Sequence, residues 1–598
     1  MYRVRLSSES VASLAIAIGL AFSGPTHAAT VTWTAGNGFW ENSANWDVGV
    51  PTASDLAVTK AGVVISSEAN NTAKELQNNA QLNVAKNTLS VGGTIVNNQS
   101  NTSASVMTSA GGNAIADRLL NYGGVVVSTD ANSLLTVGAA GFFNYGAGRV
   151  RADHGGAIHA DGFDNEGQLD AIFGGDVKLN SLVNRTGATT EAQNVGSAIS
   201  ISGLVTNQVF ASFVASDNGQ LSAGALDNAG RTLATTGGDI NLNSLNNLAG
   251  GNTEAQGPGS SITVVGPATN AAGARVAASG NANVSAGSID NSGEFLALTG
   301  GDINANSLAN HAGGTTEAQG AGSTITVTGA ATNDVGGTLA STVGANLTTS
   351  SISNSGRLLA LVGGKIDTNS LNNTVGAETR IDGTGSQVTI SGNAANKGLV
   401  EISNTGLLAA GSYSQDAGIT RLVNGTLLGT SGAQFNGGSL EGEGNVIGDT
   451  FITQNALIAP GLGFGDAGQI NIAGTFNLDG TALYEIGGIS STAYDVINVT
   501  GNAVFGGTSK LQVSLFNSFA PSLHDKFDIV LFTAGLGGTF GNSVLPALNT
   551  GLSWQINYLA DRVQLEVVAT SAVPLPASLW LMVSALLGVV SVGRRRVQ

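Results

Sequence analysis

The sequence contains no cysteine, few prolines, and little charge or aromatic character. Of its 598 residues, 9 are proline, 5% are aromatic and 11% are charged. The lack of cysteine excludes a disulfide-stabilised scaffold and any zinc site built on thiolates. An ordinary soluble domain carries about 25% charged residues. Such a low charged fraction argues against a helix-rich globular enzyme and against a coiled coil.

Basic residues are scarcer than acidic ones. The 23 lysines and arginines stand against 40 aspartates and glutamates, which gives a formal net charge of −17. A phosphate backbone would be repelled by this charge, so we expect no nucleic acid among the partners. The 42% hydrophobic content argues against disorder, and the 86 glycines are about twice the usual share.

The N-terminus has the pattern of a secretory signal peptide. Arg3 and Arg5 precede an apolar run over residues 11–22, and small residues allow cleavage between Ala28 and Ala29. The run is too short for a membrane-spanning helix, which needs about 20 apolar residues. We therefore expect Sec-type export machinery and a signal peptidase as partners.

The C-terminus combines an extended strip, an apolar run and a basic cluster. The strip is Val573, Pro574, Leu575, Pro576 and Ala577, the apolar run covers residues 577–593, and the cluster is Arg594, Arg595 and Arg596. A helix of that length reaches about 25 Å, just enough to cross a hydrocarbon core, and the arginines would remain cytoplasmic. The plain alternative is a simple tail anchor.

This arrangement resembles the PEP-CTERM family of sorting signals in its VPLPA variant. Leu575 stands where the family usually has Glu. The resemblance implies recognition by an exosortase, a membrane-embedded transpeptidase, in a Gram-negative bacterium. It also implies a transient inner-membrane anchor, followed by release to the cell surface or to an extracellular matrix rich in exopolysaccharide.

The middle of the chain is an internal repeat. The segment Gly-Gly-Asp-Val at residues 174–177 recurs in related form and at a constant interval, at residues 237–240, 300–303 and 363–366. A finer period is marked by asparagines whose gaps run 23, 21 and 19 residues, and these three gaps together make up the interval. The asparagines are Asn121, Asn144, Asn165, Asn184, Asn207, Asn228, Asn247, Asn270, Asn291, Asn310, Asn333, Asn354, Asn373 and Asn396.

The finer period predicts the coil of a right-handed parallel β-helix, so that one repeat spans three coils. A unit of about 21 residues is too short for a helical solenoid, which needs about 33 or more, and the leucine-rich-repeat consensus is absent. Ile199 and Ile201 alternate with serine, as a half-buried strand requires, and the same pattern returns in each repeat. We predict a structural ladder of stacked asparagines from Asn184 to Asn396. The alternative is that each asparagine only stabilises the turn at its own corner, and that no ladder forms.

Both ends of the repeat array differ from its middle. Trp33, Trp40 and Trp46 resemble the first coil of autotransporter passengers, and they suit either a cap on the first coil or a platform for stacking sugars. Residues 436–568 resemble the C-terminal region of such passengers, without a translocator barrel after it. Alternation over residues 527–567 predicts an antiparallel cap.

No residue pattern in the sequence predicts catalysis. The recurring acids Asp176, Asp239 and Asp302 would lie three coils, or about 14 Å, apart, too far to share a site, as would Glu191, Glu254 and Glu317. His154 and His159, near Asp153 and Asp161, lack the spacing of a helical zinc motif, and His311 is expected to be exposed. We predict no catalytic, cofactor or metal residue, although calcium at Asp, Asn and Gly turns stays open.

The sequence thus predicts an all-β solenoid between two removable segments. The expected parts are a signal peptide (1–28), an N-terminal cap with first coils (29–100), the regular β-helix (101–421), C-terminal coils with a cap (422–568) and the sorting signal (569–598). The expected function is that of a structural surface or matrix protein in adhesion, aggregation or biofilm formation, with exopolysaccharide or neighbouring cells as partners. The alternatives are a polysaccharide lyase or hydrolase and a carbohydrate-binding surface protein.

Overall fold

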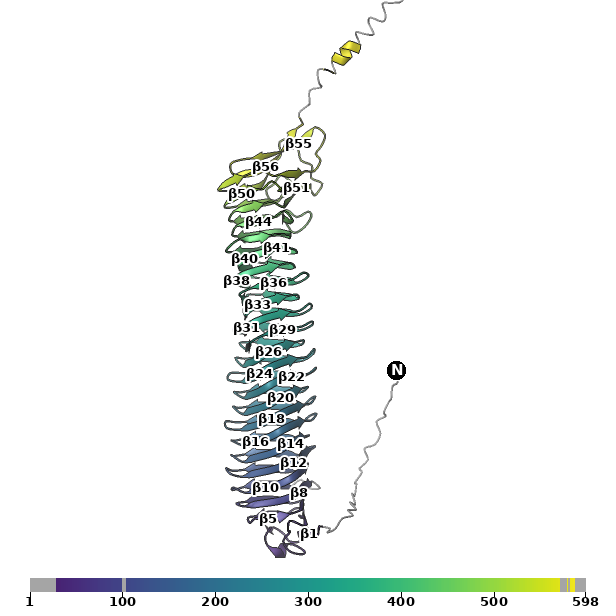
Figure 1. Cartoon of the computed structure of the whole chain (residues 1–598), viewed down its shortest axis with the longest axis vertical. Helices are drawn as coiled ribbons and strands as arrows, with labels where there is room; N and C mark the ends of the chain where they lie inside the picture. Colours follow the sequence, from purple (N-terminus) through teal and green to yellow (C-terminus); the bar gives the residue numbers. More distant parts are fainter. Residues whose placement is uncertain (1–27, 99–103, 571–577, 579–580, 587–598) are drawn as a thin grey trace, which may run out of the picture. The chain divides into compact units, whose positions relative to one another are not determined.

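A computed structural model describes residues 28–98, 104–570, 578 and 581–586 of the chain. It is a parallel β-solenoid of about 21 residues per coil, with 62% of the residues in strands. The chain divides into two compact units, Met1–Leu179 and Asn180–Gln598, called here the N-terminal and C-terminal units. Figure 1 shows the strands labelled along the chain. The predicted fold class is confirmed, while the five predicted segment boundaries stay predictions.

The N-terminal unit consists of short strands and one short 3-10 helix. Its elements are β1 (Thr30–Thr32), β2 (Gly38–Phe39), η1 (Ser43–Asn45), β3 (Leu56–Val58), β4 (Val64–Ser67), β5 (Asn71–Ala73), β6 (Glu75–Asn78), β7 (Gln81–Ala85), β8 (Thr88–Asn98), β9 (Ser105–Ser109), β10 (Asn113–Tyr122), β11 (Val125–Thr129), β12 (Leu134–Tyr145), β13 (Arg149–Asp153), β14 (Ala157–Asn165) and β15 (Gln168–Ile172). The division between the units falls within β16 (Asp176–Asn184).

The regular coils of the C-terminal unit alternate a short strand with a long one. The short strands are β17 (Thr189–Gln193), β19 (Ser212–Ser216), β21 (Arg231–Thr235), β23 (Asn252–Gln256), β25 (Arg275–Ser279), β27 (Glu294–Leu298), β30 (Thr315–Gln319), β32 (Thr338–Thr342), β34 (Arg357–Leu361), β37 (Glu378–Asp382) and β39 (Leu399–Ser403). The long strands are β18 (Ala198–Asn207), β20 (Gln220–Asn228), β22 (Asp239–Asn247), β24 (Ser261–Asn270), β26 (Asn283–Asn291), β31 (Thr324–Asn333), β33 (Asn346–Asn354), β38 (Gln387–Asn396), β40 (Leu407–Gln415) and β41 (Ile419–Gly429). In two coils the long strand is split, into β28 (Asp302–Ala305) with β29 (Leu308–Asn310) and β35 (Lys365–Thr368) with β36 (Leu371–Asn373).

The last strands of the C-terminal unit are less regular in length. They are β42 (Ala433–Phe435), β43 (Gly438–Ile447), β44 (Thr450–Ile452), β45 (Ala456–Pro460), β46 (Gln469–Ala473), β47 (Phe476–Leu478), β48 (Thr481–Ile486), β49 (Val496–Val499), β50 (Asn502–Phe505), β51 (Lys510–Leu515), β52 (Lys526–Phe532), β53 (Gly535–Gly537), β54 (Asn542–Val544), β55 (Leu552–Tyr558) and β56 (Arg562–Ala569).

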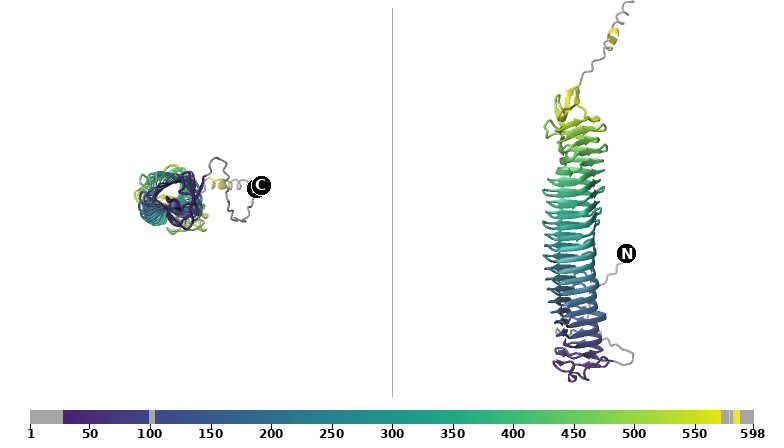
Figure 2. Two further views of the ribbon diagram at one scale, coloured as in Figure 1. Left: turned by 90° about the horizontal axis from the view of Figure 1, so that it is seen from below. Right: turned by 60° about the vertical axis from the view of Figure 1, so that its left-hand side comes forward.

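Parallel pairing of each strand with its equivalent in the next coil builds the sheets. The short strand β19 pairs in register with β21, and the long strand β18 pairs with β20. The register of β18 shifts between Ile201 and Leu204, where the long strand turns a corner and joins a further sheet. Each coil therefore pairs with the next through its short strand and through both parts of its long strand, and Figure 2 shows the coils of the C-terminal unit stacked one on another.

The core is a column of small and branched side chains. Along the first part of β22, Ile240 and Leu242 point inward and are buried, while Asn241 between them is exposed. This alternation is the period of two that a strand imposes. Because each coil is only one strand wide on each face, a column of Val, Ile, Leu and Ala fills the interior.

The repeated pair of glycines has a steric cause. A Cβ atom on Gly301 would collide with the backbone carbonyl oxygen of Ala278 in the preceding coil, and the equivalent Gly238 faces Ala215 in the same way. Gly300, directly before Gly301, has a φ of 84°, which favours glycine. Two glycines in sequence thus allow the coil to turn sharply where it passes close to its neighbour.

The C-terminal end carries the antiparallel cap that the alternation over residues 527–567 predicts. Strand β52 pairs with β56 in the antiparallel sense, and β56 in turn pairs with β55. The buried Phe527 lies 5.8 Å from Trp554, measured between ring centroids. A reversal of strand direction at this point ends the parallel pairing of the sheet.

Candidate functional site

A cavity lies in the C-terminal unit, on the outer face of the paired strands β43, β45, β48 and β51. Strands β43, β45, β48 and β51 come from successive coils and pair in parallel. Glu441 is opposite Ala459, and Leu483 is opposite Gln512. Because side chains alternate along a strand, these four residues share the solvent side of the sheet.

A glycine-rich loop forms one wall of this cavity. We call residues 461–468, between β45 and β46, the Phe464 loop. Gly461, Gly463 and Gly465 have φ values of 92°, 128° and 94°, which branched or bulky residues do not tolerate. The alternating glycines allow the loop to fold back, with Phe464 79% exposed at its tip.

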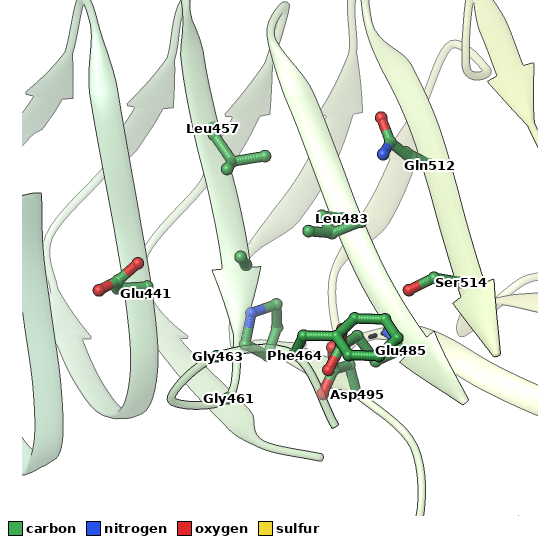
Figure 3. Close-up of a pocket in the computed structure, with 12 residues that line it drawn as sticks. Glu441, Leu457, Gly461, Gly463, Phe464, Leu483, Glu485, Asp495, Gln512 and Ser514 are labelled. Atoms are coloured by element: carbon green, nitrogen blue, oxygen red, sulfur yellow. Dashed lines mark hydrogen bonds between the residues drawn. The ribbon is translucent and has the colours of Figure 1, made fainter. Parts of the chain in front are cut away.

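The cavity has a volume of about 350 Å³ and a lining that is apolar at its centre and polar at its ends. Figure 3 shows Leu457 and Leu483 on the strands, with Phe464, Glu485 and Asp495 gathered near the strand ends. The full lining is Glu441, Leu457, Ala459, Pro460, Gly461, Gly463, Phe464, Leu483, Glu485, Asp495, Gln512 and Ser514.

Two buried carboxylates hold the Phe464 loop through its backbone. Asp495 accepts hydrogen bonds from the N–H groups of Gly468 and Glu485, at 2.8 Å each. Glu485 accepts one from the N–H of Gly465 through Oε2, at 2.7 Å. Glu485 and Asp495 are only 4% and 1% exposed. The two acids therefore fix both the loop and each other.

The electrostatics of the pair follow from this burial. The pKa of Asp495 is raised to about 8, and burial is the largest cause. The two backbone N–H groups lower this pKa, whereas the nearby Glu485 and Asp466 raise it. A carboxyl that is partly protonated near neutral pH can remain in such a place without a basic partner. No lysine, arginine or histidine belongs to the lining described above.

Glu441, at the other end of the cavity, belongs to a row of alternating charges. Arg421 donates to Glu441 at 2.6 Å and lies 3.7 Å from Glu401, which in turn lies 3.7 Å from Arg380. The residues come from the adjacent strands β37, β39, β41 and β43. Arg421 therefore neutralises Glu441, and the free negative charge of the cavity belongs to the Glu485 end.

Most of the carboxylate oxygens in the cavity already have hydrogen-bond donors. Both oxygens of Asp495 accept backbone N–H groups, and Glu441 is held by Arg421. Of the two buried acids, only Glu485 keeps an oxygen, Oε1, without a hydrogen-bond donor among the residues that the structure describes. A search of those same residues for three or more metal-ligating side chains in one place finds no such group.

The predicted asparagines lie inside the coils and form a continuous line of side-chain hydrogen bonds. In the C-terminal unit each Nδ2 donates to the Oδ1 of the next asparagine at 2.7–2.9 Å. The residues are Asn184, Asn207, Asn228, Asn247, Asn270, Asn291, Asn310, Asn333, Asn354, Asn373 and Asn396. We call this line the asparagine ladder. All its members are at most 1% exposed, so their role is structural.

The ladder extends beyond the spacing that the sequence marks. Asn396 donates to Oε1 of Gln415 at 2.9 Å, so the line of hydrogen bonds continues one coil past the last asparagine of the series. In the N-terminal unit the same kind of line begins at Asn78 and Asn97 and passes through Asn121, Asn144 and Asn165. Sequence reasoning missed Gln415 because its residue type differs and because its gap of 19 residues stands where the series of gaps has 21.

A buried threonine in each repeat also supports the ladder. Thr253, Thr316 and Thr379 donate to Oδ1 of Asn247, Asn310 and Asn373 at 3.1 Å. Thr190 does the same for Asn184 in the first repeat. In three of the repeats this threonine begins a Thr-Glu-Ala-Gln segment, at residues 190–193, 253–256 and 316–319, so the recurrence of the segment was a signal for a buried polar contact.

The recurring acids bind hydroxyl groups of a neighbouring coil. Glu191, Glu254 and Glu317 accept hydrogen bonds from Ser216, Ser279 and Thr342, each 25 residues later. Asp239 and Asp302 accept from Ser261 and Thr324, and Asp176 contacts Lys178. These acids stabilise the stacking of coils, and the three-coil interval of the repeat keeps their equivalents apart.

The three histidines considered in the sequence analysis differ in their exposure. His154 contacts Asp153 at 2.6 Å, whereas His159 lies on β14, where burial lowers its pKa. His311 is partly exposed, as expected, and lies between Asp290 at 3.0 Å and Asp334 at 2.8 Å. These two carboxylates raise the pKa of His311.

The three tryptophans form one buried cluster at the start of the N-terminal unit. The ring of Trp46 meets those of Trp33 and Trp40 edge-on, with centroids 5.0 and 4.8 Å apart. All three are less than 5% exposed. Stacking on a sugar ring requires an open aromatic face, so the arrangement favours a cap.

The two predicted targeting segments fall largely outside the described residues. Ala28 and Ala29 are described, whereas the rest of the predicted signal peptide, Val573, Pro574, Leu575, Pro576, Ala577 and Arg594, Arg595 and Arg596 are not. Within the described part of the chain, no helix has the length and apolar character needed to cross a membrane. The signal peptide and sorting signal therefore stay predictions.

No protein-family model matches the chain, and no curated protein matches it at a significant level. The fold is compatible with a surface protein and with a polysaccharide-active enzyme. Function must therefore be argued from the residues.

Proposed function

We propose that the chain is an exported structural protein of the cell surface or extracellular matrix, and that it acts in adhesion, aggregation or biofilm formation. The observation that carries this proposal is the use of the recurrent polar residues. Asn270, Glu254 and Asp302, one from each class, all bond to a residue of a neighbouring coil. A sequence that repeats such contacts maintains a stack of coils and presents no repeated catalytic pair.

The route of export rests on the two ends of the sequence. The residues before Ala29 have the pattern of a signal peptide, and the tail around Pro574 and Pro576 resembles a VPLPA-type sorting signal. In this proposal an exosortase processes the tail after the C-terminal segment has held the chain at the inner membrane of a Gram-negative bacterium.

The export route is tested by replacing both prolines of the tail. Pro574→Ala with Pro576→Ala should leave the protein in the inner-membrane fraction, because an extended strip is then no longer presented to the processing enzyme. Pro258→Ala, at an exposed corner of the solenoid, is the matched control and should reach the surface normally. Surface delivery of the double variant would contradict the proposed route.

The adhesion role is tested by deleting the gene and restoring it. Surface attachment and cell aggregation should fall in the deletion strain and return with the intact gene. Unchanged attachment and aggregation would refute the adhesion role.

We also propose that the protein is not an enzyme. Purified protein incubated with the host exopolysaccharide should leave its chain-length distribution unchanged, as measured by size-exclusion chromatography. Shortening of the polymer that disappears in Glu485→Gln would favour the polysaccharide-active alternative instead.

A further inference from the structure

Glu485 presents an acceptor to the cavity that the rest of the protein does not use. Its Oε2 is held by Gly465, and Oε1 accepts no hydrogen bond from any residue that the structure describes. Glu485 is buried, with only 4% of the residue exposed. Oε1 does not belong to the enclosed polar atoms of the described residues, so it opens into the cavity. A ligand that donates a hydrogen bond to Oε1 would use the one oxygen of these two carboxylates that the described residues leave without a donor.

The charge of the cavity determines which sign of charge the ligand should carry. Glu441 is neutralised by Arg421, whereas Glu485 has no basic partner within the described residues. Asp495, beside it, adds further negative charge when it ionises. The cavity therefore attracts a ligand with one positive group and repels an anionic one.

The lining also selects the shape of the ligand. Leu457 and Leu483 form an apolar floor, and the ring of Phe464 stands exposed beside it (Figure 3). Ser514 lies opposite Glu485 in the pairing of β48 with β51, and Gln512 lies opposite Leu483, two residues further from Glu485 along the strands. A sugar ring has apolar C–H faces and a polar rim, and it fits such a lining better than the linear side chain of lysine.

The size of the cavity suits a small part of a polymer. Its volume of about 350 Å³ lies near the lower end of ligand pockets, which span about 300–1,000 Å³. The cavity lies on the open outer face of β45, β48 and β51, so that a chain can enter and leave along the sheet.

We propose that this cavity binds an amino sugar within a polysaccharide chain. The ammonium group of the sugar donates to Oε1 of Glu485, its ring lies against Phe464 and Leu483, and its hydroxyl groups reach Gln512. Binding of this kind depends on the cavity alone, so it holds whether or not the protein follows the proposed export route.

The test uses the full-length protein and defined oligosaccharides at pH 6. Isothermal titration calorimetry should detect binding of a glucosamine tetramer, with at least tenfold weaker binding of the uncharged cellotetraose. Tetragalacturonate, which is anionic, and tetralysine, which is cationic without a sugar ring, should not bind measurably.

Two variants separate the contributions of charge and ring. Glu485→Gln keeps an amide oxygen for the N–H of Gly465 and should lose at least tenfold in affinity for the glucosamine tetramer, while cellotetraose binding stays unchanged. Phe464→Ala should weaken binding of both sugars. Glu294→Gln and Phe210→Ala, on exposed residues elsewhere in the C-terminal unit, are matched controls and should bind as the parent does.

Several results would overturn the proposal. Equal affinity for the glucosamine tetramer and cellotetraose would show that the charge of the ligand does not contribute to binding. Equal affinity for the glucosamine tetramer and tetralysine would show that the sugar ring does not contribute. Unaltered binding by Glu485→Gln, with its circular dichroism spectrum intact, would place the ligand elsewhere. Cleavage of the tetramer would assign the cavity to catalysis rather than to binding.

Discussion

At the scale of single residues, the asparagine ladder concentrates polar contacts in the buried interior of the coils. Asn270 receives a hydrogen bond from Asn247 and donates to Oδ1 of Asn291 and to the backbone carbonyl of Glu294. Each amide is thus satisfied only if the coils before and after it are correctly placed. Chains of hydrogen bonds in a low dielectric also polarise one another.

Asn270→Ala should therefore lower the free energy of unfolding by about 1–3 kcal/mol. The substitution removes a donor from Asn291 and an acceptor from Asn247, and it leaves both groups buried. Asn241→Ala, at an exposed position of β22, should change the stability by less than about 0.5 kcal/mol. Urea unfolding followed by circular dichroism measures the free energy of unfolding of both variants. Equal losses would show that the ladder does not stabilise the fold.

Asp495 predicts a dependence of stability on pH. Its pKa is about 8 in the folded protein, against an ordinary value of 3.8. Folding then binds a proton that the unfolded chain releases, so its contribution is greatest below pH 4. This stability is lost as the pH rises towards 8, by up to about 1.4 kcal/mol per pH unit.

The matched comparison for Asp495 is a side chain that cannot ionise. Asp495→Asn should remove the loss of stability between pH 5 and pH 8, although it leaves one backbone N–H without a carboxylate oxygen. Asp416→Asn, on an exposed side chain, should keep the parent's pH profile. A parent protein whose urea midpoint is constant over this range would contradict the raised pKa.

At the scale of elements, the close passage of neighbouring coils sets strict demands on glycine. Gly301→Ala should cost more than about 2 kcal/mol, because its Cβ would collide with the backbone of Ala278 and a coil would have to shift. Gly313 also lies at a corner, with a φ of 81°, but has nothing near its Cβ position. Gly313→Ala should cost only about 1–2 kcal/mol through its backbone conformation. Thermal unfolding of both variants tests this order, which an equal loss of stability would contradict.

The period of the sequence allowed the coil, its strands and the ladder to be predicted. Equivalent positions such as Ile199 and Ile262 recur at a fixed interval, so a single assignment extends to every repeat. The cavity was not predictable in this way. Glu485 and Asp495 lie after the repeat has ended. Both accept hydrogen bonds from the backbone of the Phe464 loop, and the period of the repeat does not predict these contacts. The alternating glycines of that loop were its only local signal.

At the scale of the whole molecule, the three-coil repeat is the unit that the fold can gain or lose. Three coils with gaps of 23, 21 and 19 residues return every corner to its starting type. The stability of such a chain is close to a sum over repeats and their interfaces.

Deletion of residues 239–301 should therefore leave a folded protein. The deletion joins Gly238 to Asp302 and recreates the Gly-Gly-Asp corner of the next repeat. Deletion of residues 239–249, half a coil, should prevent folding, because the strands after it lose their partners. Far-ultraviolet circular dichroism and resistance to protease measure the outcome, and an unfolded product of the longer deletion would show that the repeats are not equivalent.

The burial of the asparagine ladder also affects the rate at which its asparagines deamidate. Asparagine is among the most heat-labile residues. Its spontaneous deamidation begins when the next backbone nitrogen attacks the side-chain amide. In the ladder that nitrogen is already engaged, since the N–H of Leu248 donates to the carbonyl of Asn228 and that of Ala271 to the carbonyl of Asn247. Asn424, by contrast, is exposed and is followed by glycine, the neighbour that hinders this attack least. The fold thus places the asparagines of the ladder where their deamidation is slowest, which would suit the proposed function of a structural protein at the cell surface.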